Sequence, residues 1–196
     1  MLEAIRYNLT HLADFTGRED RPTFWWYVLF LVIVDIVLGL AVAGPMIAGG
    51  IAAGIHAAQS GIPQEQLQAQ LLHQMSAQAL SVVWISAGIK VLIMALSVAA
   101  FVRRLHDSDN PGAWAALAVA VEVIVFVLNY SMVGGMAQAM ASASSAGDLS
   151  VIAQQQQASI RWIGLLGWIA PLIVIVFGAM KSTPGPNRYG EAAQAV

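Results

Sequence analysis

The sequence predicts an all-α, polytopic membrane protein: a four-transmembrane-helix bundle with a short N-terminal amphipathic helix. Three observations predict this fold. The chain of 196 residues is 58% hydrophobic and 10% charged, with a mean hydropathy of +0.69, outside the usual range of soluble domains. Four apolar runs can each span a bilayer core, which needs about 20 residues. Nearly all basic residues lie beside one end of these runs.

We assign the whole chain, 1–196, to a single membrane domain. The apolar runs divide it into an N-terminal segment 1–21, a first span 22–43, a loop 44–79, a second span 80–102, a loop 103–111, a third span 112–132, a loop 133–160, a fourth span 161–180 and a tail 181–196. Pro63 can begin a helix that continues into the second span, and Pro171 is expected to kink the fourth.

The N-terminal segment carries apolar residues at helical spacing. Leu2, Ile5, Leu9 and Leu12 recur every three or four positions, which predicts a short amphipathic helix, with Gly17 as a C-cap. Such a helix either lies in the membrane interface or packs on the rest of the protein. The pattern does not separate these two alternatives.

The first apolar run also has features of a signal peptide. Arg18 and Arg21 precede it, and it ends in the small residues Ala41-Val42-Ala43, as a cleavage site does. However, Asp35 interrupts the run, the run is long, and further spans follow it. We therefore interpret it as a membrane helix.

Basic residues predict the orientation of the spans, because Lys and Arg concentrate in cytoplasmic loops. Loops 44–79 and 133–160 contain neither residue, which marks them as periplasmic. Only Arg161 lies on their side, and Lys90 lies within a span. Both termini are therefore expected in the cytoplasm, together with seven basic residues: Arg6, Arg18, Arg21, Arg103, Arg104, Lys181 and Arg188.

The loop between the second and third spans, in the stretch VRRLHDSDNPGAW, concentrates the polar residues of an apolar chain. The seven positions 103–109 contain four charged residues, Arg103, Arg104, Asp107 and Asp109, together with His106. Arginines at the end of a helix oppose its negative dipole end, and anionic lipid attracts them. Topology and helix capping explain most of this composition, but not His106-Asp107.

Three segments together resemble an uncharacterised bacterial inner-membrane family called domain of unknown function 805. They are RRLHD at 103–107 with the following Trp114, then Phe15-Thr16-Gly17-Arg18 with Arg21, Phe24 and Trp25, and finally Thr183–Gly190, TPGPNRYG. The resemblance implies a multi-pass protein of the bacterial inner membrane. It implies no activity.

All three segments fall on the expected cytoplasmic side, so we expect them to meet there in one polar cluster. Adjacent residues of a helix point in different directions, so a catalytic His106–Asp107 pair is not expected. A structural clamp is the preferred interpretation, in which Asp107 accepts hydrogen bonds from an arginine. The expected members are Arg18, Arg21, Arg103, Arg104, His106, Asp107, Asn187, Arg188 and Tyr189.

Three charges lie inside the predicted spans. Asp35 lies thirteen positions past Pro22, Lys90 thirteen before Arg103, and Glu122 eleven past Pro111. At about 1.5 Å per residue, all three are roughly 16–20 Å from the cytoplasmic end. We expect Lys90 to pair with Asp35 or Glu122 inside the bundle. Such a pair either fixes helix packing or forms part of a proton or cation relay.

Other chemistry is not indicated. The chain has no cysteine, no nucleophile or phosphate-loop motif, and a net charge of −2, so we expect no catalytic residue, no cofactor and no nucleic-acid binding. His56, Glu65 and His73 do not have metal-ligand spacing, so no metal is expected. The expected partners are anionic inner-leaflet lipids and a protein, either another chain or a second copy. Two functions remain open, a membrane scaffold and a small transporter or channel.

Overall fold

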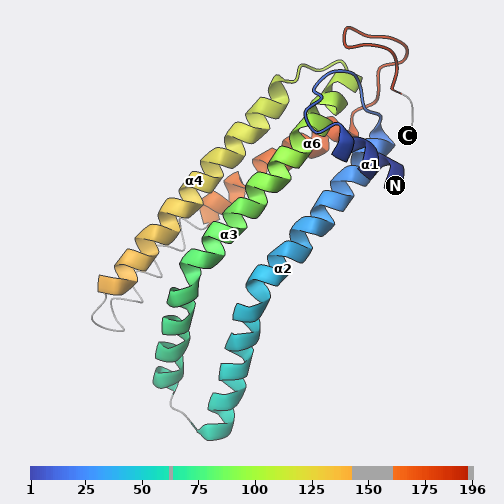
Figure 1. Ribbon diagram of the computed structural model, residues 1–196. Helices are drawn as coiled ribbons and strands as arrows, with labels where there is room; N and C mark the ends of the chain where they lie inside the picture. Colours follow the sequence, from blue (N-terminus) through green and yellow to red (C-terminus); the bar gives the residue numbers. More distant parts are fainter. Residues whose placement is uncertain (62–63, 143–160, 194–196) are drawn as a thin grey trace. The chain divides into compact units, whose positions relative to one another are not determined.

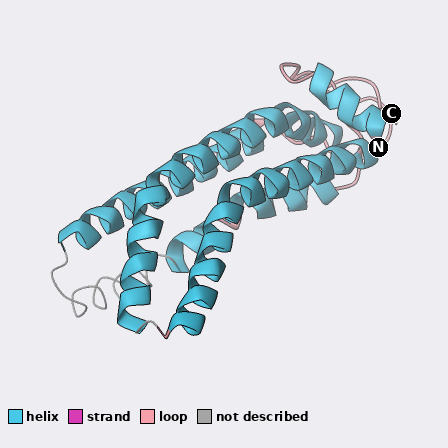
Figure 2. Ribbon diagram, turned by 60° about the horizontal axis from the view of Figure 1, so that its bottom comes forward, coloured by secondary structure: helices cyan, strands magenta, loops and turns pink. Residues whose placement is uncertain are grey.

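The computed structural model describes residues 1–61, 64–142 and 161–193, and these ranges are helical apart from turns and one isolated bridge (Figures 1 and 2). The helices are α1 (Leu2–Thr10), α2 (Arg21–Ser60), α3 (Gln64–Asp107), α4 (Ala113–Ser142) and α6 (Ile169–Ala179), with residues 161–166 also helical. Four segments are long and apolar enough to cross a membrane: Arg21–Gln59, Ser81–Asp107, Ala113–Val133 and Arg161–Ala179. The expected all-α fold with four spans is confirmed.

The chain forms two compact units, and the first consists of Met1–Leu31 and Met94–Val196. Aromatic side chains join its helices. Phe24 at the start of α2 lies 6.1 Å from Phe101 near the end of α3, between ring centroids. Trp114 of α4 lies 4.8 Å from Phe177 of α6. These contacts join the ends of α2 and α3, and those of α4 and α6.

The second unit, Val32–Ile93, is a helical hairpin made of the later part of α2 and the earlier part of α3. Here the predicted boundaries were wrong. The first span was expected to end at 43 and be followed by a loop, but α2 continues to Ser60 and includes Pro45. Residues 44–60 are rich in alanine, the best helix former, and contain no charge, so the helix continues despite the proline. The next helix starts at Gln64, directly after Pro63, as expected.

Both hairpin helices are longer than a membrane is thick. At about 1.5 Å per residue, the 40 residues of α2 extend about 60 Å, whereas a bilayer core is about 30 Å. The 44 residues of α3 extend about 66 Å. Each helix therefore continues beyond the hydrocarbon core.

Three further boundaries differ from the prediction or refine it. Residues 103–107 are the last turns of α3 rather than a loop, and α4 runs through the first part of the expected loop 133–160 to Ser142. Residues 143–160 lie outside the described ranges. The fourth span breaks at residues 167–168, where Gly167 N donates to Ile163 O. Pro171 has no N–H to donate to the Gly167 carbonyl, which explains a break at this position.

The N-terminal helix packs on the rest of the protein through Ala4 and Asn8 rather than through its leucines. α1 buries Ala4 and Asn8, while Leu2 is 76% exposed and Leu9 is also exposed. Gly17 does not cap this helix, because α1 ends at Thr10 and Gly17 occupies a later turn with φ +77°. The described chain therefore leaves Leu2 and Leu9 exposed, while Ile5 and Leu12 are partly covered.

Large apolar side chains point outward along the spans. Leu40, Ile124 and Leu165 are each more than half exposed, as are many others of their kind. Water disfavours apolar surface on this scale, whereas lipid does not. The helices also satisfy their own backbone hydrogen bonds, as a membrane requires. The chain is therefore a multi-pass membrane protein.

Candidate functional site

The polar cluster is built on the last turns of α3. Arg103, Arg104 and Asp107 have between 0% and 1% of their surface exposed. A Schellman turn ends the helix just after them: Asn110 N donates to Leu105 O at 2.9 Å. Asp109 N donates to His106 O at 3.1 Å, and Asp109 has the left-handed φ of 58° that this turn requires. The turn fixes the orientation of the α3 end.

Asp107 lies between two arginines. Its Oδ1 accepts hydrogen bonds from Arg18 Nε at 3.1 Å and Nη2 at 3.0 Å, while its Oδ2 accepts from Arg104 Nη1. Its backbone carbonyl accepts from Thr183 N at 2.9 Å and from Thr183 Oγ1 at 2.7 Å. One aspartate thus joins the N-terminal segment, α3 and the tail.

Both arginines also bind backbone carbonyls, Arg104 at the end of α6 and Arg18 in the tail. Arg18 Nη1 donates to Gly185 O at 2.6 Å, and its Nη2 donates to Thr183 O at 2.7 Å. Arg104 Nε donates to Gly178 O at 3.0 Å, and its Nη2 donates to Met180 O. The last carbonyls of a helix have no partner within it, so the Arg104 guanidinium satisfies acceptors that the end of α6 leaves open.

Arg103 forms the second half of the cluster, toward α1. Its Nε donates to Glu19 Oε2 at 3.1 Å and its Nη2 to Asn8 Oδ1 at 2.6 Å. Asn8 Nδ2 in turn donates to Glu19 Oε1 at 2.7 Å. Arg103 Nη1 donates to the carbonyls of His11 and Asp14. Burial raises the pKa of the Glu19 carboxyl, and the Asn8 amide and the Arg103 charge act in the opposite direction.

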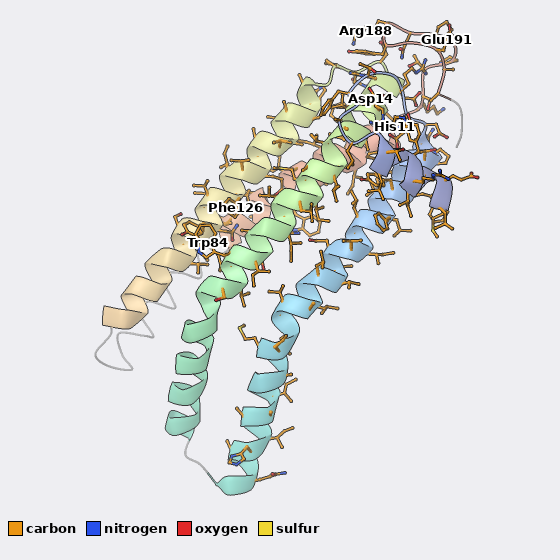
Figure 3. The ribbon with its side chains drawn as sticks, in the orientation of Figure 1. His11, Asp14, Trp84, Phe126, Arg188 and Glu191 are labelled. Atoms are coloured by element: carbon orange, nitrogen blue, oxygen red, sulfur yellow. The ribbon has the colours of Figure 1, made fainter. Side chains whose placement is uncertain are left out.

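An aromatic rim closes the cluster on its exposed side. The His106 ring stacks on Tyr189 with centroids 3.8 Å apart and planes 5° apart. Arg188 Cζ lies 4.8 Å from the Tyr189 centroid, and Arg188 Nε lies 3.0 Å from Asp109 Oδ1. Asn187 Nδ2 donates to His106 O at 2.9 Å. Figure 3 shows Arg188 at the same end of the protein as His11 and Asp14.

Gly178 allows α6 to approach the start of α2. A Cβ at this position would lie 2.7 Å from Phe24 Cε1 and 3.1 Å from Trp25 Cζ2. The Gly178 carbonyl accepts from Trp25 Nε1 at 3.2 Å and also from Arg104. A larger residue would therefore move the end of α6 away from the start of α2.

The structure brings eight of the nine expected cluster residues together, and Arg21 is the exception. Arg21 instead lines an open pocket with Asp20, Pro22, Trp25 and Ser182. The sequence analysis did not name Asn8, Glu19 and Thr183 as members. A signal for a missing acid was present, because the expected set contained five arginines and one aspartate.

The charges within the spans are held differently. Lys90 Nζ lies 2.7 Å from Asp35 Oδ2, both within the hairpin unit. Their side chains are 64% and 30% exposed, so the hairpin does not enclose them as expected. Glu122 belongs to the other unit, and in the described ranges no ion pair includes it.

No metal-binding group is formed by three or more acidic or histidine side chains that the structure describes. His56 is the described member of the three residues considered from the sequence. The side chains of Glu65 and His73 lie outside the described residues.

Four membrane-length helices, with a buried arginine cluster at the end of α3, define an integral membrane helix bundle. The model of a family described as a protein of unknown function, DUF805, matches residues 12–191, and the chain belongs to this family. The match includes the three polar segments and leaves out α1. No curated protein and no solved structure matches the chain.

Proposed function

We propose that this protein is a scaffold of the bacterial inner membrane, which holds a fixed surface of its cytoplasmic side toward another protein. One observation carries the proposal: the buried charged groups of the cluster bind one another and three distant parts of the same chain. Asp107 alone links Arg18, Arg104 and Thr183. A cluster used in this way fixes a shape.

The cluster has few polar groups that are free to act on a substrate. Arg103, Arg104 and Asp107 are enclosed, and their polar atoms already have partners within the chain. A catalytic group has to reach a substrate, and these groups do not. We therefore propose that the protein is not an enzyme and uses no cofactor.

The cytoplasmic orientation rests on the distribution of basic residues, seven on the cluster side against one on the other. Arg6 and Lys181 are exposed on that side. Each basic residue near an anionic leaflet contributes about 1 kcal/mol of attraction. Inner-leaflet lipid is thus a general partner at this end of the protein.

Photocrosslinking in intact membranes tests the scaffold. A photoreactive residue replaces Glu191, which is exposed on the tail, and adducts are identified by mass. We expect one discrete protein adduct, of either a second copy or another chain, that disappears when Asp107→Asn opens the cluster. Asp109→Asn, a change of the same kind at an exposed position, should retain the adduct. Absence of any protein adduct from exposed tail positions contradicts the proposal.

A second candidate function, a small transporter or channel with a proton or cation relay, rests on the Asp35–Lys90 pair. Ionisable groups within spans commonly mark ion pathways, and this pair is close but not enclosed. Purified protein in liposomes with a pH-sensitive dye tests the relay. A proton flux that Lys90→Met abolishes favours the transporter, while no flux in the wild type excludes a proton relay.

A further inference from the structure

We propose that the pocket at the start of α2 binds the headgroup of phosphatidylethanolamine, with Arg21 and Ser182 on the phosphate and Asp20 on the ammonium group. This lipid site is separate from the scaffold function and does not depend on it. It uses the one expected cluster residue that the cluster leaves out.

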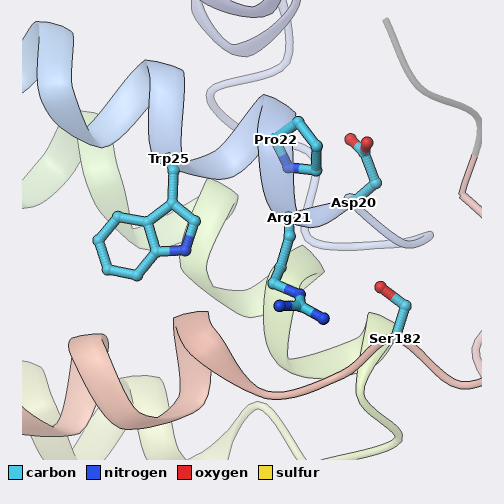
Figure 4. A pocket seen from close by; sticks show the side chains of 5 residues that line it. All are labelled: Asp20, Arg21, Pro22, Trp25 and Ser182. Carbon is cyan, nitrogen blue, oxygen red and sulfur yellow. The ribbon is translucent and has the colours of Figure 1, made fainter.

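The pocket is open, has a volume of about 540 Å³, and brings together two distant parts of the chain. Asp20, Arg21, Pro22 and Trp25 come from the start of α2 and the residue before it, and Ser182 follows α6. In Figure 4, Asp20 and Ser182 lie on one side of Arg21, and the Trp25 ring lies on the other. Its size suits a headgroup that enters from the side.

The opposite charges of this pocket do not neutralise one another. Arg21 has neither a hydrogen bond nor an ion pair among the residues that the structure describes, unlike Arg18, Arg103 and Arg104. Figure 4 shows the Asp20 carboxylate and the Arg21 guanidinium pointing in different directions. Asp20 Oδ1 is buried without a hydrogen-bond partner. A ligand with one positive and one negative group would complement both.

The location of the pocket favours a lipid over a soluble molecule. The spans Arg21–Gln59 and Arg161–Ala179 begin and end beside it, so it lies where a membrane span meets water. Trp25 is held there by its hydrogen bond to Gly178 O, and tryptophan is enriched at the level of lipid headgroups. The N-terminus of α2 adds positive potential for a phosphate.

The chemistry of the lining selects ethanolamine among common headgroups. A guanidinium binds a phosphate through two hydrogen bonds, and a hydroxyl adds a donor. Asp20 would repel a purely anionic headgroup such as phosphatidylglycerol. Choline carries a positive charge but no N–H, so it cannot donate to the carboxylate.

Native mass spectrometry of the full-length protein in detergent tests the site, with phosphatidylethanolamine added at increasing concentration. We expect one bound lipid, and we expect binding to weaken stepwise as methyl groups replace the hydrogens of the ammonium group. Arg21→Gln and Asp20→Asn should each weaken binding by about tenfold or more, the effect expected for a lost charge-assisted hydrogen bond. Arg6→Gln removes an exposed arginine outside the pocket and should leave binding unchanged.

Three results would overturn the proposal. The first is equal binding of phosphatidylcholine by the wild type, a comparison that needs no variant and no assumption about folding. The second is tighter binding of phosphatidylglycerol, strengthened by Asp20→Asn, which would make the pocket an anion site. The third is equal displacement of the lipid by water-soluble glycerophosphoethanolamine, which would identify a soluble ligand instead.

Discussion

Two sets of opposite charges occur in this protein, and they are held in opposite ways. At the end of α3, Asp107 and Arg104 are fully buried and bound to several partners each. In the hairpin, Lys90 and Asp35 have a single short contact, and the lysine side chain is 64% exposed. The first arrangement spreads each charge over several hydrogen bonds, and the second relies on one pair. The number of partners per charge, more than the presence of charge, distinguishes the buried cluster from the hairpin pair.

This comparison predicts the largest loss of stability at Asp107. Asp107→Asn removes the countercharge of two buried arginines, and breaking a buried pair costs about 3–5 kcal/mol. The free energy of unfolding, measured by denaturant titration in micelles, should fall by about that amount. Asp109→Asn is the matched control, since Asp109 is exposed two residues further along the chain. A fall of similar size in both variants would show that burial does not distinguish the two positions.

The sequence predicted the cluster better than it predicted its contacts. The shared side of the expected spans and the family resemblance placed Arg103, Arg104 and Asp107 in one cluster, although the sequence predicted a loop where α3 continues to Asp107. The acceptors Gly178 O and Met180 O were not predictable, since every residue has a carbonyl and only the end of α6 leaves these open. Asn8 was not predicted either, because the leucine pattern describes only the apolar side of α1 and says nothing about contacts of its polar side.

The ends of the helices were also difficult to predict from the sequence. The apolar runs located all four spans, but nothing in the run around Pro45 marks where α2 ends. Proline usually breaks a helix, and the alanine-rich residues that follow favour helix continuation. Local patterns oppose each other there, and the sequence alone does not show which of them decides the helix end.

Removing one partner of the hairpin pair should cause an intermediate loss of stability, which removal of the second partner reverses. Lys90→Met leaves Asp35 without its partner, and an unpaired charge at mid-membrane costs about 2.5–3.5 kcal/mol on insertion scales. Adding Asp35→Asn should restore most of the thermal stability measured in nanodiscs, whereas nothing comparable restores Asp107→Asn. Glu122→Gln serves as the control and should have little effect. If the double variant stays as unstable as the single one, the pair is not an isolated interaction.

The Glu19 half of the cluster predicts a smaller, pH-dependent effect. Burial raises the pKa of Glu19 above its ordinary 4.5, so the folded protein binds a proton more tightly than the unfolded chain does. Its stabilising contribution is complete below about pH 4.5 and is lost as the pH rises through the folded pKa. The unfolding free energy of the wild type should therefore fall relative to that of Glu19→Gln across this range. A constant difference between the two, followed by titration in micelles, would contradict the raised pKa.

Changes in the exposed rim of the cluster should have the smallest effect on the free energy of unfolding. This small effect would distinguish the rim from the buried part of the cluster. Arg188 pairs with Asp109 through side chains that are 57% and 47% exposed, and it also lies over the Tyr189 ring. Exposed pairs of this kind contribute about 0–1 kcal/mol, and salt weakens them further. Arg188→Ala should therefore lower the free energy of unfolding by no more than about 1 kcal/mol. A double-mutant cycle with Asp109→Ala, measured at low and high salt, isolates the pair from the ring contact. A coupling energy as large as the loss at Asp107 would mean that exposed and buried charges of the cluster act as one unit, and the contrast between them would disappear.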